Sequence, residues 1–240
     1  MQFYYIRHAQ SQNNRLFEES GSYEERSPDP ELTELGWKQA QRLAEFLRGD
    51  DPRATSEGFD PHNVEGFGLT HLYTSLMVRA VQTGTVVAEA LELSLQAWQG
   101  LHESGGIYRR EPETEELVGL PGGNRTFFEE HFPHLVLPES LGEEGWWNRP
   151  FEKDAERRER ARRFLQELVE RHGESEDRVA VISHGGFFNH LLGVLLDLPL
   201  HNDYWFLMNN TAIARLDFHG ERRDFIYTNR VDFLPPSLIS

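Results

Sequence analysis

The 240-residue chain contains no cysteine. This absence excludes disulfide bonds, thiolate metal sites and cysteine nucleophiles, and it leaves histidine and carboxylates as the available strong metal ligands. No apolar run approaches the roughly 20 residues that cross a bilayer. The start, MQFYYIRH, lacks a basic region followed by a secretory apolar core. We therefore expect a cytoplasmic protein that does not enter a membrane.

Positive charge is also scarce, because 24 basic residues stand against 40 acidic ones and give a formal net charge of −16. Such a surface repels nucleic acid and anionic lipid, which we exclude as partners. The basic residues are arginines apart from Lys38 and Lys153. Arginine suits the bidentate recognition of anions. An anionic ligand would therefore need a local cluster of arginines.

Length and composition predict one globular domain, since 38% of the residues are hydrophobic and 27% are charged. Apolar runs of strand length lie at 3–6, 69–74, 93–98, 179–182, 212–218 and 224–227. Helical apolar spacing follows Thr33 as far as residue 48, follows Ser75 as far as residue 91, and recurs at 154–172 and 187–196. Two polar, turn-rich segments predict loops, at 15–31 and 50–69.

Strands that alternate with helices predict an α/β fold. We expect a three-layer sandwich, with a mostly parallel sheet of about six strands and helices on both faces. Residues 104–150 break the alternation with repeated glycine and proline, and their aromatic side chains predict a small packed core. We predict that this segment is a cap, inserted into a single domain of residues 1–240 and lying over the ligand site.

Polar side chains gather where the predicted strands end. Arg7 and His8 follow the first strand, Arg79 lies one turn into the helix after the second, Glu103 follows the third and His184 follows the fourth. Ligands of such sheets bind beyond the carboxyl ends of the strands, so we expect these side chains to meet. Two arginines and two histidines would repel one another unless an anion lies among them. A dianionic phosphoryl group fits.

This arrangement predicts that His8 acts as a nucleophile. The neighbouring arginines would lower the pKa of its imidazole, and a neutral histidine is a competent nucleophile toward phosphorus. Glu103 would protonate the leaving alkoxide and then take a proton from the water that cleaves the phosphohistidine. Gly185 and Gly186 open a helix whose backbone N–H groups would hold phosphate oxygens, together with the Asn14 amide.

The same segments resemble the motifs of the histidine phosphatase superfamily, which has the phosphoglycerate mutase-like fold. The resemblance rests on Arg7-His8-Ala9 with Asn14, Leu32-Thr33-x-x-Gly36 with Gln39-Ala40, Ser75 with Arg79, Gln82 and Thr83, and Ser183-His184-Gly185-Gly186. It implies a phosphorylated nucleophile at His8, a proton donor at Glu103, and a phosphate pocket of Arg7, Asn14, Arg79 and His184.

The chain departs from the family pattern at two places. Ala9 replaces the usual glycine, and the segment after Glu103 lacks the Tyr-Gly pattern and the paired arginines expected of a cofactor-dependent phosphoglycerate mutase. We therefore predict a metal-independent phosphatase that needs no cofactor and acts on a small phosphorylated metabolite, such as a sugar phosphate or phosphoglycerate. A phosphoglycerate mutase and a phosphate-binding relative without turnover remain the alternatives.

Other residues carry weaker signals. Ser11 and Gly185 are predicted to bind substrate, and Arg109 in the insertion could contact a second anionic group. His131 and His134 have metal-like spacing, but no paired carboxylate motif accompanies them and we expect no metal site. The charged run at 152–163 predicts a solvated helix face. The sequence gives no prediction of the oligomeric state.

Overall fold

The computed structural model describes residues 1–22, 24–49, 59–199 and 203–240. Its centre is a seven-stranded sheet in the order β6-β3-β2-β7-β1-β8-β9, in which the first five strands are parallel and β8 and β9 join antiparallel. A separate antiparallel pair is formed by β4 and β5. The strands are β1 (Gln2–Arg7), β2 (His71–Thr74), β3 (Leu95–Ala97), β4 (Tyr108–Arg110), β5 (Leu117–Gly119), β6 (Leu135–Val136), β7 (Arg178–Ser183), β8 (Ile213–His219) and β9 (Arg222–Arg230).

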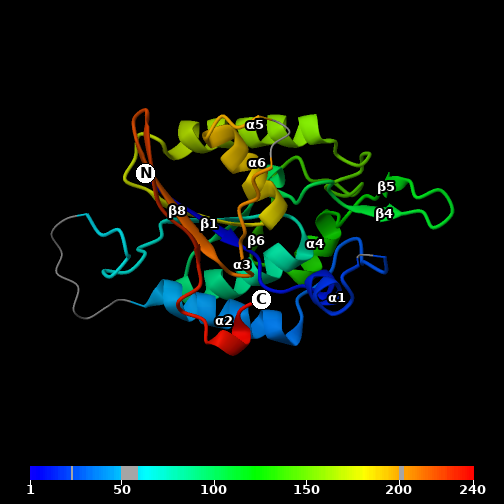
Figure 1. Ribbon diagram of the computed structural model, residues 1–240, viewed down its shortest axis with the longest axis horizontal. Helices are drawn as coiled ribbons and strands as arrows, with labels where there is room; N and C mark the ends of the chain where they lie inside the picture. The colour runs from blue at the N-terminus through cyan, green and yellow to red at the C-terminus, as the bar shows by residue number, and fades with distance from the viewer. Residues whose placement is uncertain (23, 50–58, 200–202) are drawn as a thin grey trace.

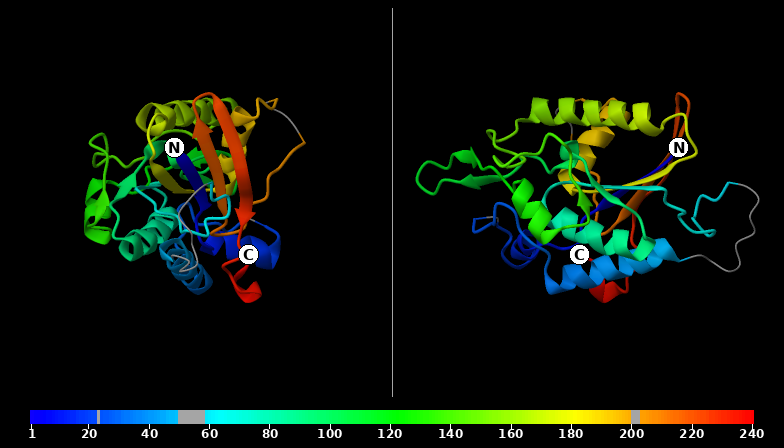
Figure 2. Two further views of the ribbon diagram at one scale, coloured as in Figure 1. Left: turned by 90° about the vertical axis from the view of Figure 1, so that its left-hand side faces the viewer. Right: turned by 180° about the vertical axis from the view of Figure 1, so that it is seen from behind.

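Helices cover both faces of the large sheet (Figures 1 and 2). Helices α5 and α6 lie on one face, α2 and α3 lie on the other, and α1 and the β4–β5 hairpin lie at the same end of the molecule. The helices are α1 (Gln12–Ser20), α2 (Glu34–Arg48), α3 (Val78–Leu91), α4 (Arg125–His131), α5 (Asp154–His172) and α6 (Gly185–Leu195), with 3-10 turns η1 (Gln99–Leu101) and η2 (Pro236–Leu238). The predicted α/β sandwich is confirmed.

Strand β1 shows how the sheet divides the core. Phe3 and Tyr5 pack in the cluster that contains Phe187 of α6, whereas Tyr4 and Ile6 pack in the cluster of α2 and α3. Alternate residues of a strand point to opposite faces, and both faces are covered here, which explains the unbroken apolar run. The carboxyl end of β1 is thereby fixed inside the sheet, between β7 and β8.

Several predicted elements have shifted ends. Ser75 was expected to cap the helix that follows it, but the helix begins at Val78 with Met77 as its N-cap residue, and the Ser75 hydroxyl oxygen accepts a hydrogen bond from the Met77 amide. Helix α6 begins at Gly185, earlier than the predicted Phe187. The sheet has seven strands rather than about six, because β6 was not expected.

The loop predicted at 15–31 is wrong where α1 occupies its first residues. Ser11 caps this helix, and Asn14 completes a reciprocal capping box with it. The one buried residue of α1 is Asn13, so the helix has no apolar stripe that a pattern could reveal. The loop predicted at 50–69 lies outside the described residues over 50–58, and no helix or strand occurs at 59–69.

The segment 104–150 belongs partly to the main body of the protein. Its strand β6 extends the large sheet beside β3, and Phe128, Trp146 and Trp147 are buried in the same cluster as the strands. The predicted packing of these aromatic residues is therefore confirmed. These residues join the core of the whole domain, because β6 pairs with β3 and so attaches the segment to the edge of the large sheet.

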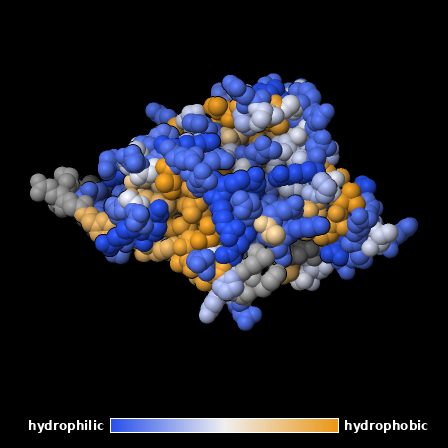
Figure 3. Space-filling model, turned by 90° about the horizontal axis from the view of Figure 1, so that it is seen from above, coloured by the Kyte–Doolittle hydropathy of each residue, from blue (hydrophilic) through white to orange (hydrophobic). Residues whose placement is uncertain are grey.

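Helix α5 exposes most of the charges predicted to form a solvated face, and the surface seen from above is largely hydrophilic with hydrophobic patches (Figure 3). Two charges differ from that prediction. Arg160 and Glu152 are buried, and the guanidinium donates two hydrogen bonds of 2.7 Å to the carboxylate. A buried charge needs such a partner. Within the described ranges, no helix has the length and apolar character needed to cross a membrane.

Candidate active site

His8 lies directly after β1, and its side chain is 3% exposed. Its Nδ1 lies 2.7 Å from the Ala9 carbonyl oxygen, which can only accept, so Nδ1 carries the proton. Nε2 accepts a hydrogen bond of 3.1 Å from Arg79 Nε. Burial first, and then Arg79 and Arg7, hold the pKa of His8 well below its ordinary value. His8 is thus a neutral imidazole with a lone pair on Nε2. The predicted direction of the shift is confirmed, although burial contributes more than the arginines.

His184 faces His8 from the end of β7, with 5.0 Å between the two ring centroids. Its ring is fully buried, and its Nε2 lies 2.9 Å from the Ser75 hydroxyl oxygen. Its Nδ1 is buried and has no hydrogen-bond partner among the described residues. Burial, reinforced by Arg79, holds the pKa of His184 well below its ordinary value. The site therefore contains two neutral histidines side by side.

Arg79 and Arg7 bring positive charge to these rings. Arg79 is 6% exposed, and burial lowers the pKa of its guanidinium. Arg7 donates from Nη1 to the Met208 carbonyl oxygen, and its guanidinium passes within van der Waals reach of the position that a side chain at Gly185 would occupy. The structure thus places both arginines around His8, as the sequence predicts.

Glu103 lies at the amino end of α6, and its carboxylate accepts three backbone hydrogen bonds. Oε1 accepts from Ser104 at 2.6 Å and from Phe187 at 2.9 Å, and Oε2 accepts from Gly186 at 3.0 Å. The prediction that the Gly186 amide is open to phosphate is therefore wrong, because Glu103 occupies it. The positive end of the helix dipole favours a carboxylate at this position. Glu103 is also near enough to Arg79 for its negative charge to favour the charged form of the guanidinium.

Asn14 and Ser11 are held together at the start of α1. The Asn14 Oδ1 accepts from the Ser11 backbone N–H at 3.0 Å, from the Ser11 hydroxyl at 2.9 Å and from Asn210 Nδ2 at 3.3 Å. Asn210 Nδ2 also donates to the His8 carbonyl oxygen at 3.0 Å, which ties this group to the backbone of His8. The Ser11 hydroxyl is thus used in capping. The Asn14 Nδ2 has no partner in the part of the chain that the structure describes.

Two charged residues of the site were missed by the sequence prediction, which assigned them to a loop. Asp29 accepts from the Val78 backbone N–H at 3.1 Å and lies 3.8 Å from Arg79 Nη1. Burial raises the pKa of Asp29 to about 7, against the opposing effect of Arg79. Arg26 is close enough to Arg79 to lower its pKa. The Ser-Pro-Asp-Pro run at 27–30 signalled a turn, but nothing in it signalled contact with a strand end.

Arg109 is not brought to this group. Its guanidinium is 58% exposed and pairs with Glu111 at 2.7 Å on the β4–β5 hairpin. Gly185, in contrast, adjoins Arg7. The site consequently holds a nucleophilic nitrogen, a second neutral histidine, several guanidiniums and a carboxylate anchored to a helix. Such a set can bind and stabilise a phosphoryl group in transfer.

The sequence model of the histidine phosphatase superfamily (branch 1) matches residues 3–57 and 61–230. The chain belongs to this superfamily. It is 26% identical over 231 residues to "Putative phosphoserine phosphatase 2" of Hydrogenobacter thermophilus, covering 95% of each chain. It is 26% identical over 230 residues to a "Probable phosphoglycerate mutase" of Yersinia enterocolitica, covering 91% of this chain and 85% of that one.

Solved structures of the superfamily share the fold. A mycobacterial glucosyl-3-phosphoglycerate phosphatase complexed with VO3 matches 93% of this chain and 96% of its own, with a TM-score of 0.58 and 20% identity. A phosphoserine phosphatase from Entamoeba histolytica, in complex with 3-phosphoglyceric acid, matches 98% and 99% with a TM-score of 0.58 and 18% identity. At these identities the likeness establishes the architecture.

The other superfamily motif residues hold the backbone around His8. The Ala9 amide donates to Thr83 Oγ1 at 3.1 Å, and the Gln10 amide donates to Gln39 Oε1 at 2.8 Å. Gly36 approaches this loop so closely that a Cβ there would lie 2.1 Å from the Gln10 carbonyl oxygen. These contacts explain why the motif contains an amide, a hydroxyl and a glycine far from the reacting atoms.

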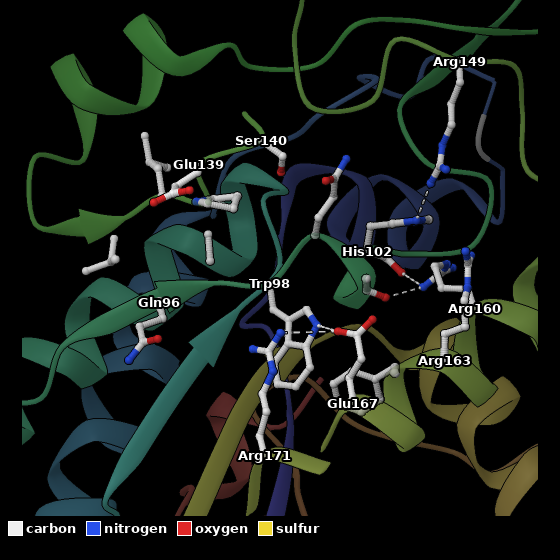
Figure 4. A pocket seen from close by; sticks show the side chains of 17 residues that line it. Gln96, Trp98, His102, Glu139, Ser140, Arg149, Arg160, Arg163, Glu167 and Arg171 are labelled. Carbon is white, nitrogen blue, oxygen red and sulfur yellow. Dashed lines mark hydrogen bonds and ion pairs between the residues drawn. The ribbon is translucent and has the colours of Figure 1, made fainter. Parts of the chain in front are cut away.

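A separate pocket of about 710 Å³ opens behind Glu103, between the sheet edge and α5 (Figure 4). It contains none of the residues predicted for the superfamily site. His102 lines it, donating from Nδ1 to the Glu103 carbonyl oxygen and accepting from Arg149 at Nε2. Arg160 donates to the carbonyl oxygen of His102 at 2.8 Å. The pocket wall therefore fixes the backbone that carries Glu103.

His71, His172 and Asp177 form a group whose ligand atoms lie within 4.8 Å of one another and could hold a metal ion. His71 begins β2, Asp177 directly precedes β7 and His172 ends α5, whereas His8 follows the carboxyl end of β1. Neither His131 nor His134 belongs to such a group in the described residues. Any metal at this position would be remote from the phosphoryl site.

Proposed function

We propose that the protein hydrolyses phosphate monoesters through a phosphohistidine on His8. One observation carries this proposal: His8 Nε2 keeps a lone pair while Arg79 and His184 surround it. In the first step Nε2 attacks phosphorus and the bond to the ester oxygen breaks. In the second step water attacks phosphorus, the N–P bond breaks and inorganic phosphate leaves.

The proposed pocket stabilises the charge that develops on the three equatorial oxygens. Arg7 and Arg79 supply guanidinium donors, and the Asn14 Nδ2 group, whose Oδ1 is already bonded, supplies another. If Ser75 donates to Nε2 of His184, the free Nδ1–H of that neutral ring is a further donor. Gly185 leaves room for the Arg7 guanidinium beside the helix.

Glu103 is the proposed acid and base. In its acid form it protonates the departing ester oxygen, and the resulting carboxylate then takes a proton from the attacking water. The Ser104 amide and two amides at the start of α6 hold the carboxylate in one place through both steps. The protons balance, because Glu103 ends the cycle in its acid form.

A small phosphorylated metabolite is the proposed substrate. The relatives named above act by name on phosphoserine, glucosyl-3-phosphoglycerate or phosphoglycerate, which are all small phosphomonoesters. The name of the Yersinia relatives makes a phosphoglycerate mutase the second candidate. Conversion of 3-phosphoglycerate to 2-phosphoglycerate, assayed with and without bisphosphoglycerate, separates transfer from hydrolysis. Phosphate release without isomer formation favours the phosphatase.

The variant His8→Ala tests the proposed nucleophile. Loss of the nucleophile should lower kcat on a generic aryl phosphate by about a thousandfold or more. Wild-type activity should survive excess chelator, because the proposed chemistry uses no metal. His131→Ala, which removes an exposed imidazole on α4, is the matched control and should keep wild-type kcat.

Mass spectrometry of the wild-type reaction should locate the phosphoryl adduct on His8, provided that quench and digestion are carried out at alkaline pH, because acid hydrolyses the N–P bond of phosphohistidine. Adduct formation at another residue, or inhibition by chelator that added metal reverses, would overturn the mechanism. Tight phosphate binding without turnover on a broad panel of monoesters would instead identify a non-catalytic relative.

A further inference from the structure

Arg26 joins two segments that are distant in the sequence. Its guanidinium carbon lies 4.0 Å from the centroid of the Tyr108 ring, at the base of the β4–β5 hairpin. Tyr108 itself packs edge-on against Phe151, with 4.7 Å between ring centroids. A guanidinium stacked on an aromatic ring has one face covered and a fixed orientation. The segment before α2 and the segment 104–150 thus meet at the end of the molecule where α1 and the β4–β5 hairpin lie (Figure 1).

Within the described residues, the Arg26 guanidinium forms no ion pair. Its Nε is buried and has no hydrogen-bond partner among the described residues. Three arginines in the segment 104–150 are different, because Arg109 pairs with Glu111, Arg110 pairs with Glu115, and Arg125 pairs with Glu129. The fourth, Arg149, donates to His102 in the separate pocket. The second anionic contact that the sequence assigned to Arg109 is therefore better provided by Arg26.

Nearby carboxylates do not compensate Arg26. Asp29 caps α3 and pairs with Arg79, and its raised pKa leaves it only partly ionised near neutral pH. Glu103 is bound by backbone amides. The positive charges of Arg26 and Arg7 both repel that of Arg79. A single phosphoryl group would have to balance all three charges. An additional anion beside the phosphoryl group would relieve this repulsion.

We propose that Arg26, stacked on Tyr108, binds a carboxylate on the organic part of the substrate, so that the protein acts on small phosphomonoesters carrying a carboxylate. This inference rests on the proposed function. Tyr108 covers one face of the guanidinium and Nε is buried, so the guanidinium offers its end, where the two Nη groups form a planar two-donor fork. That fork matches the two oxygens of a carboxylate.

The test compares substrates that differ only in the carboxylate. 3-Phosphoglycerate carries it, and glycerol 3-phosphate has a hydroxymethyl group in its place. The measured quantity is the ratio of their kcat/KM values. Wild type should prefer 3-phosphoglycerate, and Arg26→Met should reduce the ratio by about 10- to 100-fold, the range of a charge-assisted hydrogen bond. Using the ratio cancels any general effect of the lost charge on phosphoryl transfer.

Matched variants keep the proposal falsifiable. Arg110→Met removes a neighbouring charge that already pairs with Glu115, and it should leave the ratio unchanged. Tyr108→Leu should lower the ratio, and Tyr108→Phe, which keeps the ring, should restore it. An Arg26→Met enzyme that loses activity equally on both substrates would overturn the assignment. A larger loss on a carboxylate-free bisphosphate than on 3-phosphoglycerate would also overturn it in favour of a second phosphate.

Calorimetric binding distinguishes failure of this inference from failure of the proposed function. If the wild-type protein hydrolyses neither of these esters nor any member of the broad panel of phosphate monoesters, the proposed function fails. The same ratio can then be taken from dissociation constants for 3-phosphoglycerate and glycerol 3-phosphate. An Arg26-dependent preference for the carboxylate supports the subsite, and equal affinities in wild type contradict it.

Discussion

At the scale of single residues, the site depends on which nitrogen carries a proton and which oxygen is already bonded. His8 owes its lone pair to two contacts, with the Ala9 carbonyl oxygen and with Arg79 Nε. Glu103 has each carboxylate oxygen bonded to backbone amides. The residue types could be predicted from the sequence. Their hydrogen-bond partners could not, because those come from segments far apart in the chain.

Glu103→Gln tests the proposed acid role. The amide keeps the side-chain shape, but it cannot donate a proton to an alkoxide. We expect a much larger loss of kcat on alkyl phosphates than on activated aryl phosphates, whose leaving groups need little protonation. Comparison of kcat across a series of leaving groups measures this difference. Equal losses on all of them would remove Glu103 from the acid role.

The same variant should also be less stable. One side-chain oxygen becomes an NH2 group, which would face an amide donor instead of accepting from it. Leaving such a buried donor unsatisfied costs about 1–3 kcal/mol of unfolding free energy. The leaving-group comparison is independent of this loss, because every substrate is measured on the same folded variant.

At the scale of helices and strands, the sequence predicted best those elements that bury many apolar residues. Strand β1 buries four of its six residues and helix α3 buries nine of its 14, and both were predicted with small errors at their ends. Helix α1 was missed because its stabilising features are a polar capping box and one buried asparagine. Strand β6 has two residues and so leaves no period to detect. Arg26 and Asp29 lie in the polar segment between α1 and α2, where composition predicts turns but does not reveal tertiary contacts.

Helix α6 joins the second histidine motif to Glu103, and Gly186 is the point of contact. A Cβ at this position would lie 2.4 Å from Glu103 Oε1, so Gly186→Ala should displace the carboxylate. We expect Gly186→Ala to reproduce the leaving-group dependence of Glu103→Gln. Steady-state kcat on alkyl and aryl phosphates measures it.

Gly193 provides the matched control on the same helix. A Cβ at Gly193 would meet nothing within 4 Å. Gly193→Ala should therefore keep wild-type kinetics and gain up to about 1 kcal/mol of stability from helix propensity. Wild-type kinetics in Gly186→Ala would show that Glu103 does not need its place on α6.

At the scale of the whole molecule, buried ionisable groups with opposite shifts determine how stability depends on pH. The pKa values of His8, His102 and His184 lie well below the ordinary 6.5, chiefly because burial disfavours the charged ring. Burial raises the pKa of Asp29 from 3.8 to about 7. The phosphoryl pocket thus contains groups that respond to acid in opposite directions.

The signs follow from proton linkage. Each buried histidine binds its proton less tightly in the folded state, so its contribution is fully present above about pH 6.5 and is lost as pH falls below that value. Asp29 binds its proton more tightly when folded, so its contribution is fully present below about pH 4 and is lost as pH rises through about 7. Between these limits the histidines outnumber Asp29, and their combined contribution makes acid destabilise the protein.

Two variants separate these contributions. His102→Gln removes one histidine, and it should reduce the loss of unfolding free energy between about pH 6.5 and 5 by about 1.4 kcal/mol per pH unit. Asp29→Asn removes the opposing group and should steepen that loss by a similar amount. Urea unfolding at several pH values measures both slopes, with His131→Gln as the exposed control. Slopes that change in the same direction in both variants would contradict the opposite shifts, because only groups with opposed pKa changes can move the proton balance of unfolding in opposite directions.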